Sequence, residues 1–130
     1  MSSAVLDASA LLALVLNEPG RSVVAAAVGA GAGAVIGTVN LSEVVAKLRE
    51  NGATEAAIHL ALDPLAITVA NFDTDLAYAA GFLRPATRAV GLSMSDRACL
   101  ALAQRLSLPV LTADRAWASL SLGITITVIR

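Results

Sequence analysis

The stretch AVLDASALLALVL, residues 4–16, contains the two apolar patterns that decide the fold. The segment Ser3–Leu6 is a short apolar run that ends at Asp7, and such a run predicts a buried strand. From Ser9 to Leu16 large apolar residues recur at helical spacing, until Pro19-Gly20 interrupts the pattern. A strand followed directly by a helix is the repeating unit of α/β proteins.

The remainder of the chain alternates in the same way. Further strands are predicted over Val35–Val39, Ile67–Val69, Pro109–Leu111 and Ile124–Ile129. Further helices are predicted over Arg21–Val28, from Leu41 to Asn51-Gly52, and over Ala53–Leu62, Asp73–Leu83 and Ser95–Leu106. We therefore expect a single domain over residues 1–130 with a three-layer α/β fold, in which helices flank a mostly parallel central sheet of about five strands.

The composition excludes several classes of protein. Hydrophobic residues make up 57% of the 130 residues and charged residues 15%, which excludes a disordered chain because the apolar surface offsets the entropy of ordering. Cys99 is the only cysteine, so no internal disulfide can form. The first residues lack the basic region of a secretory signal, and both observations lead us to expect a cytoplasmic protein.

The uncharged stretch from Ser22 to Ser42 is long enough to suggest a membrane span. Four glycines interrupt it, so the end of a helix, a loop of small residues and a strand fit the sequence better. Its Gly-Ala repeat also differs from a nucleotide-binding loop, because the spacing is not G-x-G-x-x-G and the repeat precedes a predicted strand. We predict an ordinary loop.

Four of the ten acidic residues fall at comparable places in the predicted fold. Asp7 and Asp114 come just after strands, whereas Glu43 and Asp96 lie in the first turns of helices. In parallel sheets such positions meet where the strand order reverses, and carboxylates in a shared cleft repel one another. A divalent cation would relieve the repulsion, and ligands that are all oxygen favour Mg²⁺ or Mn²⁺ over Zn²⁺.

Each acid also has a purely structural interpretation. The segments Asn40–Glu43 and Ser93–Asp96 both match the pattern that caps a helix N-terminus. Asp7 and Asp114 fit turns or caps equally well. Capping and metal binding are compatible, because a carboxylate in the first turn points away from the helix end. Four acids in one expected crevice are nevertheless harder to explain as four independent caps.

These acids lie in the segments VLDASA (5–10), NLSEV (40–44), GLSMSDRACLALA (91–103) and LTADRAW (111–117). In this order the segments resemble the motifs of PIN-domain ribonucleases, and among them those of the VapC toxins of bacterial toxin–antitoxin pairs. The resemblance extends over essentially the whole chain. Ser95 departs from the pattern, since VapC-like sequences commonly have Gly there.

The resemblance implies a metal-dependent endoribonuclease in which the four acids Asp7, Glu43, Asp96 and Asp114 hold one or two Mg²⁺ or Mn²⁺ ions. It also implies supporting roles for the polar residues Ser9, Asn40 and Thr112, with Asn40 orienting Glu43. Each of these three fits a cap or turn equally well. VapC-like toxins are homodimers inhibited by a small VapB-type antitoxin, so the resemblance implies both kinds of partner. The apolar segments Leu11–Leu16 and Ala25–Val45 could provide either surface.

RNA binding would have to depend on local charge, because the net charge of −1 gives no general attraction to phosphate. Four arginines lie in or beside the half of the chain that carries the last two motifs: Arg84, Arg88, Arg97 and Arg115. They are either RNA contacts or ordinary solvated charges. Aromatic residues make up only 3%, so extensive base stacking is not expected. His59 is expected to be a structural or surface residue, and Cys99, on the apolar face of its predicted helix, a small core residue.

Two other classes of protein share parts of this sequence pattern. A PIN-like module that only binds another protein would not need all four acids. A phosphoacceptor receiver domain would need an aspartate that ends the third strand and a lysine that ends the fifth. Asp73 follows its strand only loosely, and the only lysine, Lys47, lies on a predicted helix. Both alternatives are therefore less well supported than the nuclease.

Overall fold

Apolar residues form a five-stranded sheet at the centre of the computed structural model, which describes all residues from Met1 to Arg130. The strands are β1 (Val5–Leu6), β2 (Ala34–Gly37), β3 (Ile67–Ala70), β4 (Val110–Thr112) and β5 (Ile126–Val128). Their order is β3-β2-β1-β4-β5, and all neighbouring pairs are parallel. Val5 of the central strand pairs with both Val35 and Val110. The chain places β2 and β3 on one side of β1, and β4 and β5 on the other. The strand order therefore reverses between β1 and β4, which is where ligands bind in such sheets.

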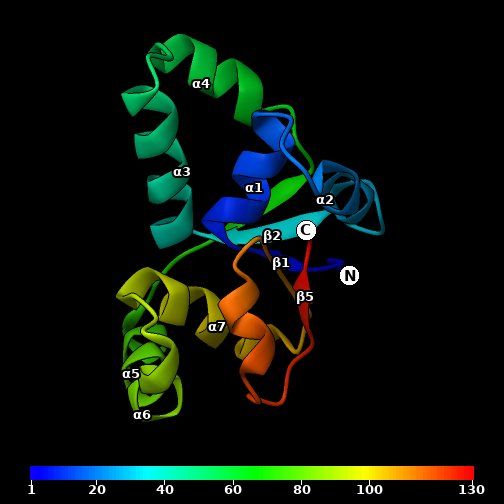
Figure 1. Cartoon of the computed structure of the whole chain (residues 1–130). Coiled ribbons are helices and arrows are strands. Elements are labelled where there is room, and N and C mark those ends of the chain that lie inside the picture. Colours follow the sequence, from blue (N-terminus) through cyan, green and yellow to red (C-terminus); the bar gives the residue numbers. More distant parts are fainter.

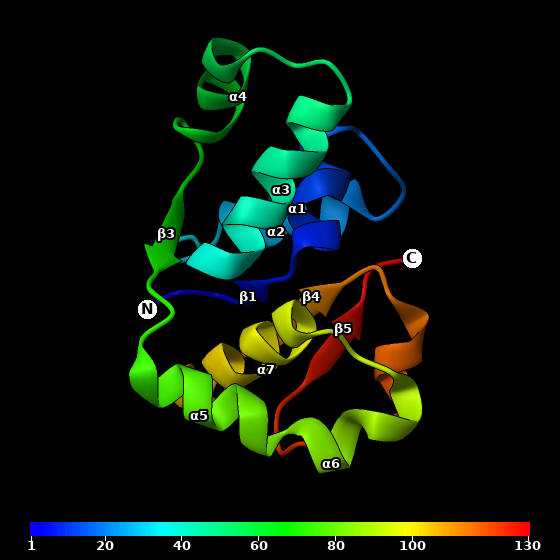
Figure 2. The same ribbon diagram turned by 90° about the vertical axis from the view of Figure 1, so that its left-hand side faces the viewer.

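Helices cover both faces of the sheet (Figures 1 and 2). One face carries α1 (Ala8–Val15), α2 (Arg21–Val28), α3 (Thr38–Glu50) and α4 (Glu55–Leu62). The other carries α5 (Thr74–Phe82), α6 (Arg84–Thr87) and α7 (Met94–Leu106), with short 3-10 helices η1 (Arg88–Val90) and η2 (Arg115–Ser119). Leu6 belongs to the first of two core clusters and Val5 to the second, because successive strand residues point to opposite faces. The predicted three-layer α/β fold is confirmed.

The most consequential difference from the predicted elements concerns α3. Thr38, predicted to lie in a strand, is the first residue of the helix, and Gly37 is its N-cap. Glu43 therefore lies in the second turn and not, as predicted, in the first. Asn40 lies inside the helix, so it does not cap it. The apolar side of α3 packs into the core, and such packing overrides the weak local preference of β-branched residues for strands.

The uncharged stretch that suggested a membrane span consists of α2, a loop and β2. No helix is long and apolar enough to cross a membrane. The loop depends on Gly33, whose φ of +87° is unfavourable for other residues. A Cβ atom there would collide with the carbonyl oxygen of Ala66, which accepts the backbone N–H of Ala34 at 3.0 Å. The glycine thus permits the close approach that starts the pairing of β2 with β3.

Gly33→Ala is expected to lower the free energy of unfolding by about 2 kcal/mol or more, because it combines an unfavourable φ with a backbone collision. Gly52→Ala is the matched control, since Gly52 also has positive φ, +98°, but a Cβ there would meet nothing within 4 Å. The control should lose about 1 kcal/mol. Urea unfolding of both variants measures the difference, and equal losses would show that the contact with Ala66 is unimportant.

Candidate metal centre

Asp7 lies at the carboxyl end of the central strand and begins α1. Its side chain is buried, with 5% of the residue exposed. Oδ1 accepts hydrogen bonds from the N–H of Ala10 at 2.8 Å and from the hydroxyl of Ser9 at 2.7 Å. Oδ2 accepts from the hydroxyl of Thr112, at 2.6 Å. The carboxylate is thus both the N-cap of α1 and a contact between β1 and β4.

Burial raises the pKa of Asp7 above its usual value. The hydrogen bonds from Thr112, Ser9 and Ala10 oppose this effect, and the negative charge of Asp96 adds to it. The carboxylate is therefore costly to ionise without a compensating cation nearby. A buried carboxylate with a nearby acid is the electrostatic setting in which a bound cation stabilises the folded chain.

Asp114 follows the neighbouring strand β4 and is joined to the same network. Its N–H donates to the hydroxyl of Thr112 at 3.0 Å, and the hydroxyl of Ser9 accepts the N–H of Ala113 at 2.9 Å. Oδ1 of Asp114 accepts the N–H of Ala116, which caps η2. The predicted adjacency of the strands before Asp7 and Asp114 is present, since β1 pairs with β4. Asp114 itself is exposed.

Asp96 lies in the first turn of α7 and forms a capping box with Ser93. The N–H of Ser93 donates to Oδ2 of Asp96 at 3.1 Å, and the hydroxyl of Ser93 accepts the N–H of Asp96 at 3.2 Å. The structural role predicted from the Ser93–Asp96 spacing is thus present. One capping bond leaves oxygen lone pairs available, so the capping role does not exclude a second one.

Glu43 approaches from the opposite layer, on α3. Its Oε1 accepts from Nδ2 of Asn40 at 3.2 Å, and the same nitrogen donates to the backbone carbonyl of Ser95 at 3.0 Å. Asn40 is almost completely buried, whereas Glu43 is exposed. The predicted pairing of Asn40 with Glu43 is therefore present, and the contact with Ser95 is an addition that sequence spacing could not reveal.

The buried thiol of Cys99 is affected by three of these carboxylates. It is fully buried on α7, as predicted for a small core residue. Burial raises the pKa of its thiol well above the ordinary value, and the negative charges of Asp7, Asp96 and Glu43 raise it further. Asp7, Asp96 and Glu43 are thus each near enough to Cys99 for their charges to act on its thiol.

The carboxylates are gathered but not assembled as ligands. No three acidic, histidine or cysteine side chains lie close enough together to form a ligand cluster. The donors at this edge are nevertheless all oxygen atoms, from carboxylates and hydroxyls, which suit Mg²⁺ or Mn²⁺. The residues therefore fit such an ion in chemistry and charge, and binding would require them to draw together.

The four arginines differ in how exposed they are and in which groups they contact. Arg97 is partly buried and donates through Nη1 to the carbonyl of Ala80 at 3.0 Å, so it joins α7 to α5. Arg115 donates through Nε to the carbonyl of the last residue at 3.2 Å. Arg84 and Arg88 are exposed. Neither takes part in a salt bridge, so their charges face solvent.

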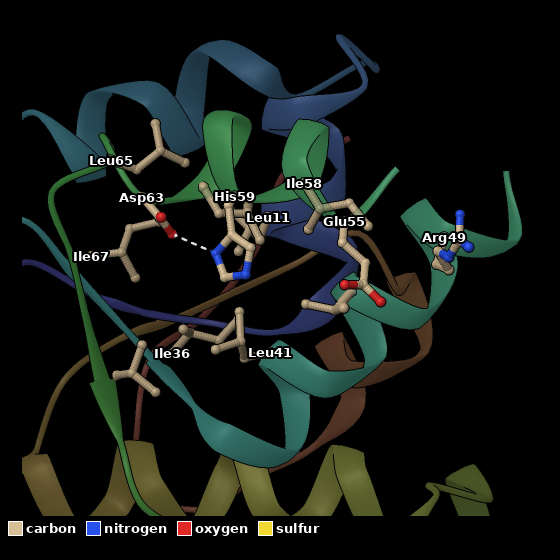
Figure 3. Close-up of a pocket in the computed structure, with 13 residues that line it drawn as sticks. Leu11, Ile36, Leu41, Arg49, Glu55, Ile58, His59, Asp63, Leu65 and Ile67 are labelled. Atoms are coloured by element: carbon tan, nitrogen blue, oxygen red, sulfur yellow. Dashed lines mark hydrogen bonds and ion pairs between the residues drawn. The ribbon is translucent and has the colours of Figure 1, made fainter. Parts of the chain in front are cut away.

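The largest cavity lies away from the acids, between α3, α4 and the β2–β3 edge of the sheet (Figure 3). It has a volume of about 600 Å³, and nine of its thirteen lining residues are hydrophobic. Figure 3 shows Leu11, Ile36 and Leu41 lining this groove, with His59 paired to Asp63 at 3.3 Å. His59 is an exposed surface residue, as predicted. The groove was not predicted, because its walls come from segments far apart in the sequence.

The family model described as PIN domain matches residues 4–121. No curated protein matches the chain. A toxin–antitoxin complex from Klebsiella pneumoniae contains a chain of similar structure, with a TM-score of 0.75, 21% identity and 98% of each chain covered.

Two further solved structures have the same architecture. DNA-bound VapBC from Salmonella typhimurium matches with a TM-score of 0.75 and 20% identity over 98% of each chain. VapC20 of Mycobacterium tuberculosis, a toxin that cleaves the sarcin–ricin loop, matches with a TM-score of 0.70 and 17% identity, over 95% of this chain and 99% of that one. At these identities the structural matches establish the fold.

Proposed function

The chain belongs to the PIN domain family, whose model matches residues 4–121, and from that premise we propose that it is a metal-dependent endoribonuclease. We further propose that it is the toxin of a type II toxin–antitoxin pair of the VapC kind. The observation that carries the nuclease proposal is the buried carboxylate of Asp7, whose pKa is raised by burial and by the nearby charge of Asp96. Such a site favours a bound cation, and a bound cation can in turn bind the phosphate of a phosphodiester.

Asp7, Glu43, Asp96 and Asp114 are the residues that would hold Mg²⁺ or Mn²⁺. The ion would supply a Lewis acid that activates water and offsets charge on the phosphate and the leaving oxygen. The chain's own groups have distinct tasks. Ser9 and Thr112 hold the Asp7 carboxylate in one orientation through bonds of 2.7 and 2.6 Å. The capping box holds Asp96 at the start of α7.

Addition of metal to the purified chain tests this proposal. Mg²⁺ or Mn²⁺ should raise the melting temperature, because binding to the folded state stabilises it and relieves carboxylate repulsion. The same ions should be required for cleavage of RNA, and cleavage should stop when EDTA is added. A melting temperature that stays constant through the millimolar range, together with intact RNA, would instead support the non-catalytic interaction module.

Arg84 and Arg88 are proposed as phosphate contacts, since both are exposed and free of salt bridges. Arg84→Ala and Arg88→Ala should each weaken RNA binding and reduce the slope of log K against log salt by about one. Arg49→Ala is the control, because Arg49 lies beside the apolar groove and not near the acids. Fluorescence anisotropy at several salt concentrations measures the slopes, and unchanged slopes would identify Arg84 and Arg88 as ordinary surface charges.

A VapB-type antitoxin is the proposed protein partner, because the Klebsiella structure is a toxin–antitoxin complex and the Salmonella structure is a VapBC complex. The apolar groove between α3 and α4 is the candidate surface. It includes Leu11 and Val45 from the two segments singled out in the sequence. Its volume of about 600 Å³ suits the apolar face of a helix from another protein. A VapB-type antitoxin that co-purifies with the wild-type chain should fail to co-purify with Val45→Arg if the groove is that surface.

A homodimer is proposed as the assembly. Tyr78 and Phe82 of α5 form an aromatic pair with ring centroids 6.1 Å apart, and they are 65% and 76% exposed. Aromatic residues are enriched at interfaces between proteins relative to the rest of the surface. Sedimentation of the wild-type chain and of Phe82→Ser would show whether a dimer forms and whether α5 contributes to it.

A further inference from the structure

We propose that the apolar groove between α3 and α4 binds preferentially a partner helix that carries positive charges along one edge, because α4 presents acidic side chains beside the apolar lining. The inference rests on the proposed function, which assigns this groove to a VapB-type antitoxin. It goes further by giving the charge pattern of the antitoxin helix that the groove would accept.

One face of α3 and one face of α4 form the two walls of the groove. The lining side chains recur every fourth residue on both helices: Leu41, Val45 and Arg49 on α3, and Glu55, His59 and Asp63 on α4. Side chains at this spacing lie above one another on the same face of a helix. The groove therefore lies between two rows of side chains, one mostly apolar and the other polar.

The apolar lining of the groove has no covering element. Ile58 and Leu62 of α4 line it together with Ile67 and Val69 of the edge strand β3. Val45 and Val69 are 37% and 45% exposed, whereas valine is among the residues that are most often buried. A partner helix with apolar residues at positions i, i+3 or i+4, and i+7 would cover this lining.

The acids of α4 are not neutralised by a lysine or arginine of the chain. Glu55 takes part in no salt bridge, and Asp63 is paired only with His59, at 3.3 Å (Figure 3). Arg49 is the only lysine or arginine that lines the groove, and it donates to the carbonyl of Ala53 at 3.1 Å. The lining residues of α1, β2 and β3 carry no charge. The α4 wall therefore has an excess of negative charge.

The two acids also determine the spacing of the complementary charges. Glu55 and Asp63 are eight residues apart, and the backbone is still helical at Asp63. At the rise of an α-helix they are separated by about 12 Å along α4. A helix that lies beside α4 could pair both acids with lysines or arginines at the same spacing. A helix with acidic residues at these positions would face like charges, which lowers its affinity.

Two fluorescein-labelled peptides of about 15 residues, a length at which isolated helices begin to be stable, test the inference by fluorescence anisotropy. Both have the same apolar stripe. One has two lysines beside it at the spacing of Glu55 and Asp63, and the other has glutamates at those positions. At low salt the lysine peptide should bind the wild-type chain about tenfold more tightly than the glutamate peptide, and high salt should reduce this difference.

Glu55→Gln and Asp63→Asn should each weaken binding of the lysine peptide about two- to fivefold, as expected for the loss of one exposed charge pair. Glu50→Gln is the matched control. Glu50 is an exposed acid at the end of α3 that does not line the groove, so this variant has the same change in net charge as the others. It should bind the lysine peptide as tightly as the wild-type chain does.

The outcomes separate this inference from the proposed function. Equal binding of the two peptides, unchanged binding by Glu55→Gln and Asp63→Asn, or no binding of the lysine peptide would each overturn the charge preference. None of these results affects the nuclease, because metal-dependent cleavage of RNA is measured without a partner. If the lysine peptide binds as expected but Val45→Arg still co-purifies with the antitoxin, the charge preference stands and the antitoxin is overturned as the occupant of the groove.

Discussion

Asp96→Asn is expected to fold and to lose RNA cleavage by roughly a hundredfold or more, because several kcal/mol of charge stabilisation depend on the metal that this carboxylate would bind. The substitution keeps the size of the side chain. Its amide oxygen can still accept the N–H of Ser93, which lies 3.1 Å from Oδ2 of Asp96 in the wild-type chain. The variant should therefore keep the hydrogen bond from the N–H of Ser93 and lose only the negative charge.

Ser93→Ala is the matched control, because it removes the opposite part of the same capping box. The hydroxyl of Ser93 accepts the N–H of Asp96 at 3.2 Å, and its loss should cost about 1 kcal/mol of stability. Every carboxylate remains in place, so this variant should be less stable and still cleave RNA at saturating Mg²⁺. If Asp96→Asn retained wild-type cleavage under the same conditions, Asp96 would be a helix cap only.

Sequence patterns were sufficient for the architecture, because buried strands and amphipathic helices leave distinct apolar periods. The helix Arg21–Val28 has the bounds that were predicted. The start of α3 was wrong because Thr38 and Val39 favour strands locally, whereas core packing determines the helix. The short helices α6, η1 and η2 were missed because each contains too few residues to show a period.

The candidate site was predictable to the extent that it depends on strand ends. Asp7 and Asp114 follow adjacent parallel strands, so the topology alone brings them to one edge. The link between Asn40 and Ser95 spans 55 positions and depends on how α3 and α7 pack across the sheet. The groove lined by Leu11, Ile58 and Val69 likewise requires the tertiary structure. Sequence spacing therefore predicts which residues meet at strand ends, but not which side chains connect the layers.

Asp7→Asn is expected to abolish cleavage and, in metal-free solution, to raise the melting temperature. The amide oxygen of the new side chain can accept the N–H of Ala10, and its NH₂ can donate to Thr112 once that hydroxyl rotates, so the cap and the contact to β4 remain. What disappears is a buried charge, whose cost raises the pKa of Asp7. Removing that charge stabilises the fold as long as no cation compensates for it.

The pH dependence gives this prediction a definite sign. Because the pKa of Asp7 in the folded chain is raised above 3.8, the folded state binds its proton more tightly than the unfolded state does. This difference in proton binding contributes to the free energy of unfolding. The contribution is fully present below about pH 3.8 and is lost as the pH rises through the raised pKa of Asp7. The advantage of Asp7→Asn over wild type should therefore be small in acid, grow with pH and then level off.

Millimolar Mn²⁺ should reverse this order, since it stabilises the wild-type chain and leaves Asp7→Asn largely unaffected. Asp63→Asn serves as control because its side chain is 70% exposed at the rim of the apolar groove, and it should respond to Mn²⁺ as wild type does. Calorimetric melting between pH 4 and 8, with and without Mn²⁺, measures both effects. A variant less stable than wild type at neutral pH without metal would show that the three hydrogen bonds to Asp7 outweigh the cost of its burial. The carboxylate would then stabilise the fold even when no cation is bound.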